Sequence, residues 1–158
     1  MLAFGDDPVQ AELEKYAASF PKPKAVVILS AHSVSTEAIH VLSTKQNRVM
    51  HDFAGFPDEL YDINYTCPGD PELATRVGQM FAEAGFSVNV DQDAPLDHGI
   101  WIPLMHLYPK GDVPVVRVSL PVHQIPAKIL KMGHALAPLR EQGAVSYTHL
   151  TLPTIYSV

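Results

Sequence analysis

The 158-residue chain has the length of one ordinary domain, which can bury a hydrophobic core without disulfides or structural zinc. Hydrophobic residues make up 47% of it and charged residues 18%, a balance that argues against wholesale disorder. The formal net charge of -6 argues against general binding to nucleic acid, which needs clustered Lys and Arg. The single cysteine, Cys67, cannot form an intrachain disulfide, and we expect a reducing, cytoplasmic compartment. No signal-peptide pattern is visible, and no apolar run is long enough to span a bilayer.

The first half of the chain predicts a helix, two strands and a long loop. Asp7 and Pro8 are suited to a helix N-cap and first turn, and apolar residues then recur at helical spacing as far as Phe20. Residues 24–30 form an apolar run rich in β-branched side chains, typical of a strand that is covered on both faces of a sheet. Residues 38–44 are a second strand candidate. Residues 51–71 are rich in Gly, Pro, Asp and aromatic residues without a sustained period, which predicts a long ordered loop with a functional role.

The second half of the chain alternates helices with strands. A helix begins at Asp70 and is ended by Gly85. The elements expected after it are a strand at 86–90, a helix at 100–108, a strand at 113–120 and an amphipathic helix at 125–140. This order predicts an α/β fold, a mixed sheet with flanking helices in a single domain.

Residues 145–158 break the pattern. The run from Val145 to Thr154 matches the translation of a transposon-end sequencing adapter in one reading frame, so we expect residues 145–158 to be a non-native read-through tail. The alternative is a genuine, poorly packed C-terminal peptide. We therefore interpret residues 1–144 as the domain and leave His149 out of the functional argument.

Two histidines are candidates for chemistry. His32 lies just past the strand predicted at 24–30, where ligand sites of open α/β sheets gather, and a neutral imidazole there can ligate Fe(II) or Zn(II). The alternative is a hydrogen-bonded loop histidine. In Asp97-His98-Gly99, the Asp97 carboxylate can orient His98 by accepting from one ring nitrogen, which leaves the other for acid–base chemistry or substrate contact. A helix N-cap at Asp97 explains the same motif nearly as well.

Further candidates lie in the loop and in the helix at 100–108. His51 and Asp52 can line a polar pocket, with a surface turn as the equal alternative. Trp101 and Tyr61 can stack on an aromatic substrate, although core packing is the commoner fate of such residues. Because the chain has no phosphate loop, no Gly-x-Ser-x-Gly elbow and no CxxC pair, nucleotide binding and serine-hydrolase chemistry have no support.

In chain order these motifs resemble one family. The motifs are the segment 20–32 ending in Ser-Ala-His, the loop sequence His-Asp-Phe-Ala-Gly-Phe-Pro at 51–57 with the Leu-Tyr pair at 60–61, Tyr65, Pro-Gly at 68–69, Asp-His-Gly at 97–99, and Trp101. Together they resemble the LigB-type class III extradiol ring-cleavage dioxygenases, specifically the 4,5-DOPA dioxygenase extradiol group. The resemblance runs from about residue 6 to residue 144, and the loop is its most specific part.

The resemblance implies a mononuclear non-haem metal enzyme. Members open catechol-type rings with O2 next to the two hydroxyls, using Fe(II), and some bind Zn(II) at the same position. By motif, His32 matches a metal ligand and His98 matches the catalytic histidine that faces substrate and dioxygen. We expect His51, Asp97 and Trp101 to bind the aromatic substrate.

The sequence also departs from the family pattern. The family begins with a strand that ends in a His-Gly-Ser-Pro motif, whose histidine is another metal ligand, and it continues beyond the position of Ala144 to a Val-His-Asn motif. Neither motif occurs in this sequence, and Ser33 stands where the family often has an aromatic residue. We therefore expect an incomplete catalytic domain in which His32 is the one retained metal ligand, and no turnover by the chain itself.

Two other functions remain open. One is a non-catalytic protein of the same fold that binds zinc or a small aromatic molecule. The other is a metal-dependent hydrolase using His32 and Asp97, which lacks a second ligand pair at plausible spacing. The catechol that is cleaved and the oligomeric state are not fixed by the sequence.

Overall fold

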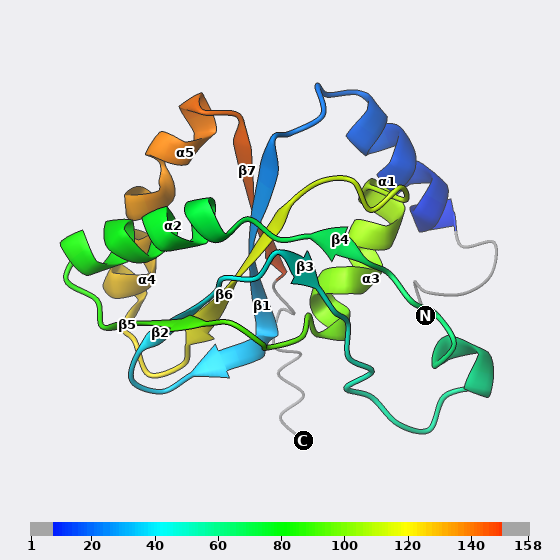
Figure 1. Cartoon of the computed structure of the whole chain (residues 1–158), viewed down its shortest axis with the longest axis horizontal. Helices are drawn as coiled ribbons and strands as arrows, with labels where there is room; N and C mark the ends of the chain where they lie inside the picture. Colours follow the sequence, from blue (N-terminus) through cyan, green and yellow to red (C-terminus); the bar gives the residue numbers. More distant parts are fainter. Residues whose placement is uncertain (1–7, 150–158) are drawn as a thin grey trace, which may run out of the picture.

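A five-stranded sheet in the order β5-β2-β6-β1-β7 organises residues 8–149, the part of the chain that the computed structural model describes (Figure 1). Its strands are β1 (Ala25–Ser35), β2 (Ile39–Leu42), β5 (Val88–Asp91), β6 (Val115–Pro121) and β7 (Ala144–His149). β1 lies parallel to both β6 and β7, and β2 lies parallel to β5, whereas β2 and β6 are antiparallel. The sheet is therefore mixed.

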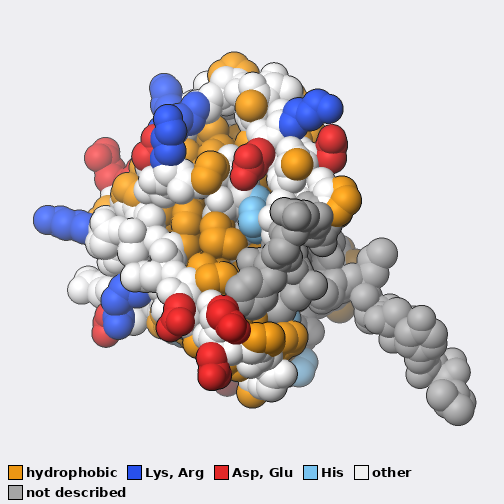
Figure 2. All heavy atoms as spheres, turned by 90° about the vertical axis from the view of Figure 1, so that its right-hand side faces the viewer, with side chains coloured by type: hydrophobic (Ala, Val, Ile, Leu, Met, Phe, Trp, Pro, Cys, Tyr) orange, Lys and Arg blue, Asp and Glu red, His pale blue; other side chains and the backbone are white. Residues whose placement is uncertain are grey.

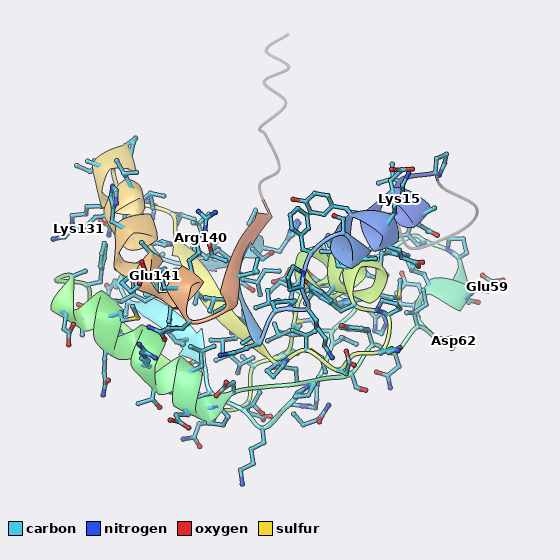
Figure 3. All side chains as sticks on the ribbon, turned by 90° about the horizontal axis from the view of Figure 1, so that it is seen from above. Lys15, Glu59, Asp62, Lys131, Arg140 and Glu141 are labelled. Atoms are coloured by element: carbon cyan, nitrogen blue, oxygen red, sulfur yellow. The ribbon has the colours of Figure 1, made fainter. Side chains whose placement is uncertain are left out.

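Helices cover both faces of this sheet. α1 (Pro8–Ala18) and α3 (His98–Leu107) lie on one side, and α2 (Pro71–Glu83), α4 (Pro126–Leu136) and α5 (Pro138–Glu141) lie on the other. The view from above separates the two layers: Lys15 of α1 lies at one side of the molecule, and Lys131 and Arg140 lie at the other (Figure 3). Within residues 8–149, no helix is both long enough and apolar enough to cross a membrane.

The central strand β1 supplies side chains to two hydrophobic clusters because successive residues of a strand point to opposite faces. Val26 and Ile28 pack in the cluster beneath α3, with Ile100, Trp101 and Leu104. Val27 and Leu29 pack in the cluster beneath α2 and α4, with Val77, Phe81 and Met132. Burial on both faces explains why residues 25–29 are continuously apolar rather than alternating.

The long loop contains two short elements. A 3-10 turn, η1 (Asp58–Leu60), lies midway along it, and β4 (Cys67–Pro68) near its end pairs with β3 (Gln46–Asn47) in a second, two-stranded sheet. The buried side chains of Leu60 and Tyr65 belong to the cluster beneath α3. The loop is therefore anchored to the core, as the prediction of an ordered loop requires.

The predicted fold class is confirmed, and β1 and the last predicted helix differ from the prediction. β1 runs on to Ser35, past the predicted end at residue 30, and carries His32 within it. The helix predicted at 125–140 is two helices, because Pro138 lacks the N–H that would continue the first. Asp70 caps α2 as predicted, and Gly85 beyond its end has φ 82°. The N-cap predicted at Asp7 lies outside the described residues.

The first five residues of the predicted tail belong to the fold. Residues 145–149 belong to β7, which pairs in parallel with residues 25–30 of β1 and forms one edge of the sheet. The domain boundary predicted at residue 144 therefore falls at the first residue of a strand. Residues 150–158 lie outside the described residues, and the non-native origin of the segment stays a prediction.

Candidate metal centre

His32 projects from a bulge in β1. The register between β1 and β6 is regular as far as Ser30 opposite Ser119 and resumes at Val34 opposite Leu120. Ala31, His32 and Ser33 therefore lie outside the ladder, against a single step of β6. A bulge of this kind re-aims a side chain at the edge of a sheet. The His32 side chain is consequently exposed, beyond the buried residues 25–30 of the strand.

A short backbone pairing brings the loop to the start of α3. The amide of Leu96 donates to the Arg48 carbonyl, at 2.7 Å, and the amide of Met50 donates to the Leu96 carbonyl, at 2.9 Å. The indole Nε1 of the buried Trp101 donates to the Met50 carbonyl at 3.0 Å. These bonds hold the segment just before Asp52 against the residues just before His98.

His32, Asp52 and His98 form a compact cluster. Each offers one potential ligand atom, and these atoms all lie within 4.8 Å of one another. The rings of His32 and His98 have centroids 4.1 Å apart and planes inclined by 42°. The three residues come from β1, the loop and α3, so only the tertiary structure brings them together.

Asp52 holds His98 at two points. The backbone N–H of His98 donates to Asp52 Oδ1 at 2.9 Å, which satisfies one of the unpaired donors at the N-terminus of α3. Oδ2 of Asp52 lies 3.0 Å from Nδ1 of the His98 ring, but the alignment does not make a hydrogen bond, and this buried nitrogen has no hydrogen-bond partner in the described structure. The side chains of His98 and Asp52 are only 23% and 18% exposed.

The donor set fits a divalent metal ion. Two imidazoles and one carboxylate are the protein ligands of the facial triad in non-haem Fe(II) oxygenases, and the same donor types also suit Zn(II). A buried ring nitrogen without a hydrogen bond costs free energy unless something else satisfies it. An ion beside Nδ1 of His98 would do so. The cluster therefore has both the chemistry and the spacing of a metal site.

Of the residues predicted to bind substrate, His51 lies beside the cluster. It is half-buried, and its Nε2 donates to the Ile63 carbonyl at 2.9 Å. Its ring packs edge-on against Phe53 and Trp101, with centroids 5.7 and 5.5 Å away. Phe53 also contacts the ring of His98, at 5.8 Å. An aromatic wall thus adjoins the two histidines.

Asp97 and Trp101 lie beneath the cluster, both with 0% of their surface exposed. The sequence left two interpretations of the Asp97 carboxylate open, orientation of the His98 ring and a side-chain N-cap of α3, and the structure shows neither. The oxygens of Asp97 instead accept hydroxyl hydrogen bonds from Ser30 and Ser33, and the carboxylate beside the His98 ring is that of Asp52. Contact of Asp97 or Trp101 with a substrate stays a prediction.

Asp52 is the member of the cluster that the predicted site omitted. The sequence suggested that Asp52 lines a polar pocket with His51, but nothing in it places Asp52 against His98, 46 residues further along the chain. The signal that could have found it is the residue type, because a carboxylate is the usual partner of a catalytic or metal-ligating histidine.

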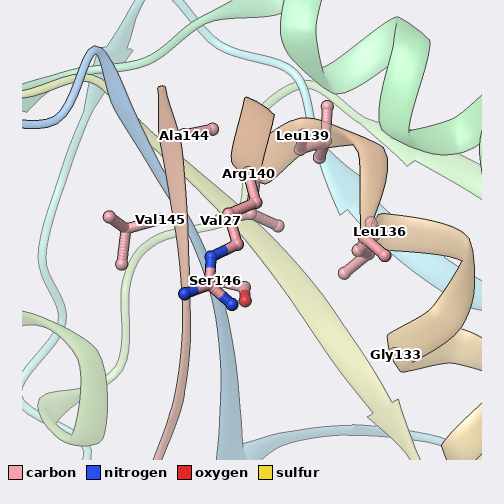
Figure 4. A pocket seen from close by; sticks show the side chains of 9 residues that line it. Val27, Gly133, Leu136, Leu139, Arg140, Ala144, Val145 and Ser146 are labelled. Carbon is pink, nitrogen blue, oxygen red and sulfur yellow. The ribbon is translucent and has the colours of Figure 1, made fainter. Parts of the chain in front are cut away.

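Two cavities lie away from this cluster. One, of about 430 Å³, lies between β7 and the α4–α5 pair and is lined by Val27, Leu136 and Arg140 (Figure 4). The other, of about 570 Å³, lies between α1, α3 and β7 and is lined by Tyr16 and Phe20. Exposed hydrophobic side chains mark the face that carries α1 and α3 (Figure 2). Neither cavity is lined by an Asp, Glu or His, so neither offers a metal site.

Cys67 is fully buried, and burial raises the pKa of its thiol to about 11, against the opposing hydrogen bond from Asn47. A thiol with this pKa is protonated at neutral pH and is a poor nucleophile. Cys67 is therefore a structural residue of β4.

A mixed sheet with helices on both faces, and a strand end that brings two imidazoles and a carboxylate together, defines an α/β protein with a candidate metal centre. The chain belongs to the LigB family: residues 9–147 match the family described as the catalytic LigB subunit of aromatic ring-opening dioxygenase. LigB extradiol dioxygenases are metal-dependent, in keeping with the His–His–Asp cluster.

Curated relatives of this chain are named as extradiol dioxygenases. The chain is 43% identical over 126 residues to the 4,5-DOPA dioxygenase extradiol of Beta vulgaris, covering 78% of this chain and 46% of that protein. It is 37% identical over 131 residues to the 4,5-DOPA dioxygenase extradiol of Escherichia coli K12, covering 82% and 47%. The chain thus spans about half the length of the curated relatives it matches.

A solved structure shares the fold. A crystal structure of an uncharacterized Escherichia coli K12 protein superimposes with a TM-score of 0.74 at 29% sequence identity, covering 92% of this chain and 53% of that one. The resemblance to the LigB-type family that the motifs indicated is therefore confirmed, and so is the α/β fold.

Proposed function

We propose that this chain supplies part of the active site of an extradiol dioxygenase, which opens a catechol-type ring with O2 at an Fe(II) ion. Zn(II) is the alternative metal at the same position. The observation that carries the proposal is the clustering of His32, Asp52 and His98, with potential ligand atoms within 4.8 Å of one another. The names of the curated relatives support the reaction type.

In this proposal His32 ligates the metal and His98 takes a proton from a substrate hydroxyl. A bound Fe(II) would hold the two catechol oxygens next to O2 and lower the pKa of the substrate hydroxyls. His98 is suited to accept a proton because its ring lies directly beside that of His32 and Asp52 fixes its backbone.

The aromatic residues beside the cluster suit a planar substrate. Phe53 contacts the rings of both His51 and His98, so a catechol ring held at the histidines would pack against an apolar surface. We propose that His51 contributes to this wall and that the buried Trp101 supports it from below. The indole N–H of Trp101 donates to the Met50 carbonyl, and its ring packs against that of His51.

The first test is metal binding by the purified 158-residue chain. We expect anaerobic titration with Fe(II), or with Co(II) as a spectroscopic probe, to show one ion bound per chain. His32→Ala should abolish specific binding, whereas His134→Ala, which removes an exposed imidazole from α4, should leave it unchanged. Absence of specific binding, or binding that is indifferent to His32→Ala, would contradict the metal centre.

The second test separates the role of His98 from that of His32. The chromogenic substrate analogue 4-nitrocatechol changes its visible spectrum when it loses its protons at a metal. We expect this change in the metal-loaded chain, and we expect His98→Gln to weaken it while metal is retained. Loss of the metal in His98→Gln would instead make His98 a ligand, as its orphaned Nδ1 would allow.

The same experiment addresses the non-catalytic alternative. Binding of metal without any response to 4-nitrocatechol would favour a metal-binding protein of the LigB fold. Oxygen uptake with catechol by the 158-residue chain would strengthen the dioxygenase proposal and would overturn the expectation that this chain has no turnover by itself.

A further inference from the structure

The carboxylate of Asp97 is fully buried, and both its oxygens are used by two serines of β1. Ser30 Oγ donates to Oδ1 at 2.7 Å, and Ser33 Oγ donates to Oδ2. No lysine, arginine or histidine among residues 8–149 forms an ion pair with Asp97. A buried carboxylate without such a pair is costly and needs its hydrogen bonds.

These two serines flank His32 in the bulge of β1. Ser30 is the last residue in the regular register with β6, and Ser33 is the last residue before the register resumes at Val34. Ser30 Oγ also accepts the backbone N–H of His32 at 3.1 Å. One carboxylate therefore closes the bulge across its two ends, and it does so in the stretch of β1 where the sheet itself provides no ladder hydrogen bonds.

Asp97 also belongs to the start of α3. Its backbone carbonyl accepts from the amides of Ile100 and Trp101, at 3.0 and 3.1 Å, so its backbone position is set by the first turn of the helix. His98 follows it directly in the chain. The same residue thus holds the strand end that carries His32 and the helix turn that carries His98.

The adjoining cation is Arg117 of β6. Its side chain is only 11% exposed, its Nη1 donates to the Pro95 carbonyl at 2.9 Å, and Nη2 lies 3.7 Å from Asp91. Burial lowers the pKa of the Arg117 guanidinium, while Asp91 and Asp97 act in the opposite direction. Its positive charge offsets part of the cost of burying Asp97 without occupying the carboxylate oxygens, which remain available to the serines.

We propose that Asp97 is a positioning residue: through Ser30 and Ser33 it sets the bulge that places the His32 imidazole against His98. It acts through these side chains and touches neither metal nor substrate. The inference rests on the proposed function in so far as His32 is a metal ligand, but its geometric content, the approach of the two rings to 4.1 Å, can be tested without metal.

The Asp97 carboxylate and the hydroxyls of Ser30 and Ser33 form a hydrogen-bonded clamp, and the variants remove its groups one or two at a time. Ser33→Ala deletes one partly buried hydroxyl and leaves the carboxylate in place. Asp97→Asn keeps one acceptor oxygen, and Asp97→Ala removes both. Matched controls are Asp93→Asn, an exposed acid of the loop preceding α3, and Ser19→Ala, whose exposed hydroxyl donates to the Tyr16 carbonyl at the end of α1.

The measurements are the affinity for Co(II) or Zn(II), the visible spectrum of the Co(II) form and the thermal unfolding of each variant. We expect metal affinity to fall by about 10- to 100-fold in Asp97→Asn and Ser33→Ala, as is typical when a group that orients a ligand is lost. The Co(II) spectrum should change, and Asp97→Ala should lose more than Asp97→Asn. A purely structural role would lower the unfolding temperature and leave the affinity and spectrum of the folded protein unchanged, which would overturn the proposal.

Nuclear magnetic resonance of the metal-free chain keeps the test independent of the proposed function. We expect a nuclear Overhauser effect between the ring protons of His32 and His98 in the wild type and in both controls, and its loss in Asp97→Asn and Ser33→Ala. If the wild type binds no metal but shows this pattern, the metal centre fails and the positioning role stands. If the ring contact persists in both clamp variants, the positioning role fails whatever the metal does.

Discussion

Gly99 lies where α3 starts against the bulge of β1, and no larger residue fits there. A Cβ at this position would meet His32 Cδ2 at 2.8 Å, Ser30 Oγ at 2.9 Å and Asp97 Oδ1 at 3.0 Å. Ser30 and Asp97 belong to the hydrogen-bonded clamp that holds the bulge, and His32 belongs to the candidate metal site. The glycine is therefore required for the close approach of strand and helix, and its value lies in the absence of a side chain.

We expect Gly99→Ala to destabilise the fold by about 1–3 kcal/mol, because the extra methyl overpacks a buried contact. It should also weaken metal binding, since relief of the overlap displaces His32. Urea unfolding and Co(II) titration measure the two effects. The control is Gly133→Ala in α4, where nothing lies within 4 Å of the added Cβ; helix propensity should make it stabilising by about 0.5–1 kcal/mol. Equal effects of both substitutions would show that the contact at Gly99 is unimportant.

At the scale of single elements, capping residues determine where the helices start. Asp70 accepts from the amide of Leu73 at 2.9 Å, and Pro71 follows it at the first helical position, so α2 begins where both signals predict. Asp97 stands at the same position of α3 but makes no side-chain cap bond, because Ser30 and Ser33 occupy its oxygens. The first amide of α3 is satisfied instead by Asp52, from the loop.

Because Asp70 caps α2 and lies outside the candidate metal site, its loss should affect stability alone. Asp70→Ala should lower the free energy of unfolding by about 1 kcal/mol through loss of the cap, without any effect on metal affinity. Urea unfolding and Co(II) titration of the same samples check both parts. Glu83→Ala at the opposite end of α2 removes the same charge without a cap and should change stability by less than about 0.5 kcal/mol. A loss of metal affinity in Asp70→Ala would contradict the assignment of Asp70 to the helix alone.

At the scale of the whole molecule, β7 covers the outer edge of β1. Its residues 144–149 pair with residues 25–30, the buried stretch of β1, and Val145 lines cavities on both sides of the strand. An uncovered edge of a central apolar strand presents unpaired amides and carbonyls and invites aggregation. Residues 145–149 thus have a structural effect in this chain whatever their origin.

We expect deletion of residues 145–158 to lower the unfolding temperature by more than about 5 °C, a few kcal/mol for a domain of this size, and to promote aggregation. Deletion of residues 150–158 alone retains β7 and serves as the matched control. Calorimetry and light scattering of the two shortened chains provide the comparison. Identical behaviour of the full chain and the longer deletion would return residues 145–149 to the status of a tail outside the fold.

The sequence by itself determined the α/β class, most strand and helix positions and the family, and it singled out His32 and His98 as candidate site residues. Those conclusions depend on local signals, namely the apolar run at 25–29, the Asp-Pro cap of α2 and the order of short motifs. Pro138 marks the break between α4 and α5, but the helical pattern on both sides of it predicted a single helix.

Only the tertiary structure decided which carboxylate lies beside His98. Sequence proximity joined Asp97 to His98, whereas the fold turns Asp97 inward to the serines of β1 and brings Asp52 to His98 from the loop. The reason is that the backbone pairing of residues 48–50 with Leu96, and the bulge that frees residues 31–33 from the ladder, are long-range contacts without a local sequence signature. These contacts assemble the candidate metal centre from three residues that lie far apart in the chain.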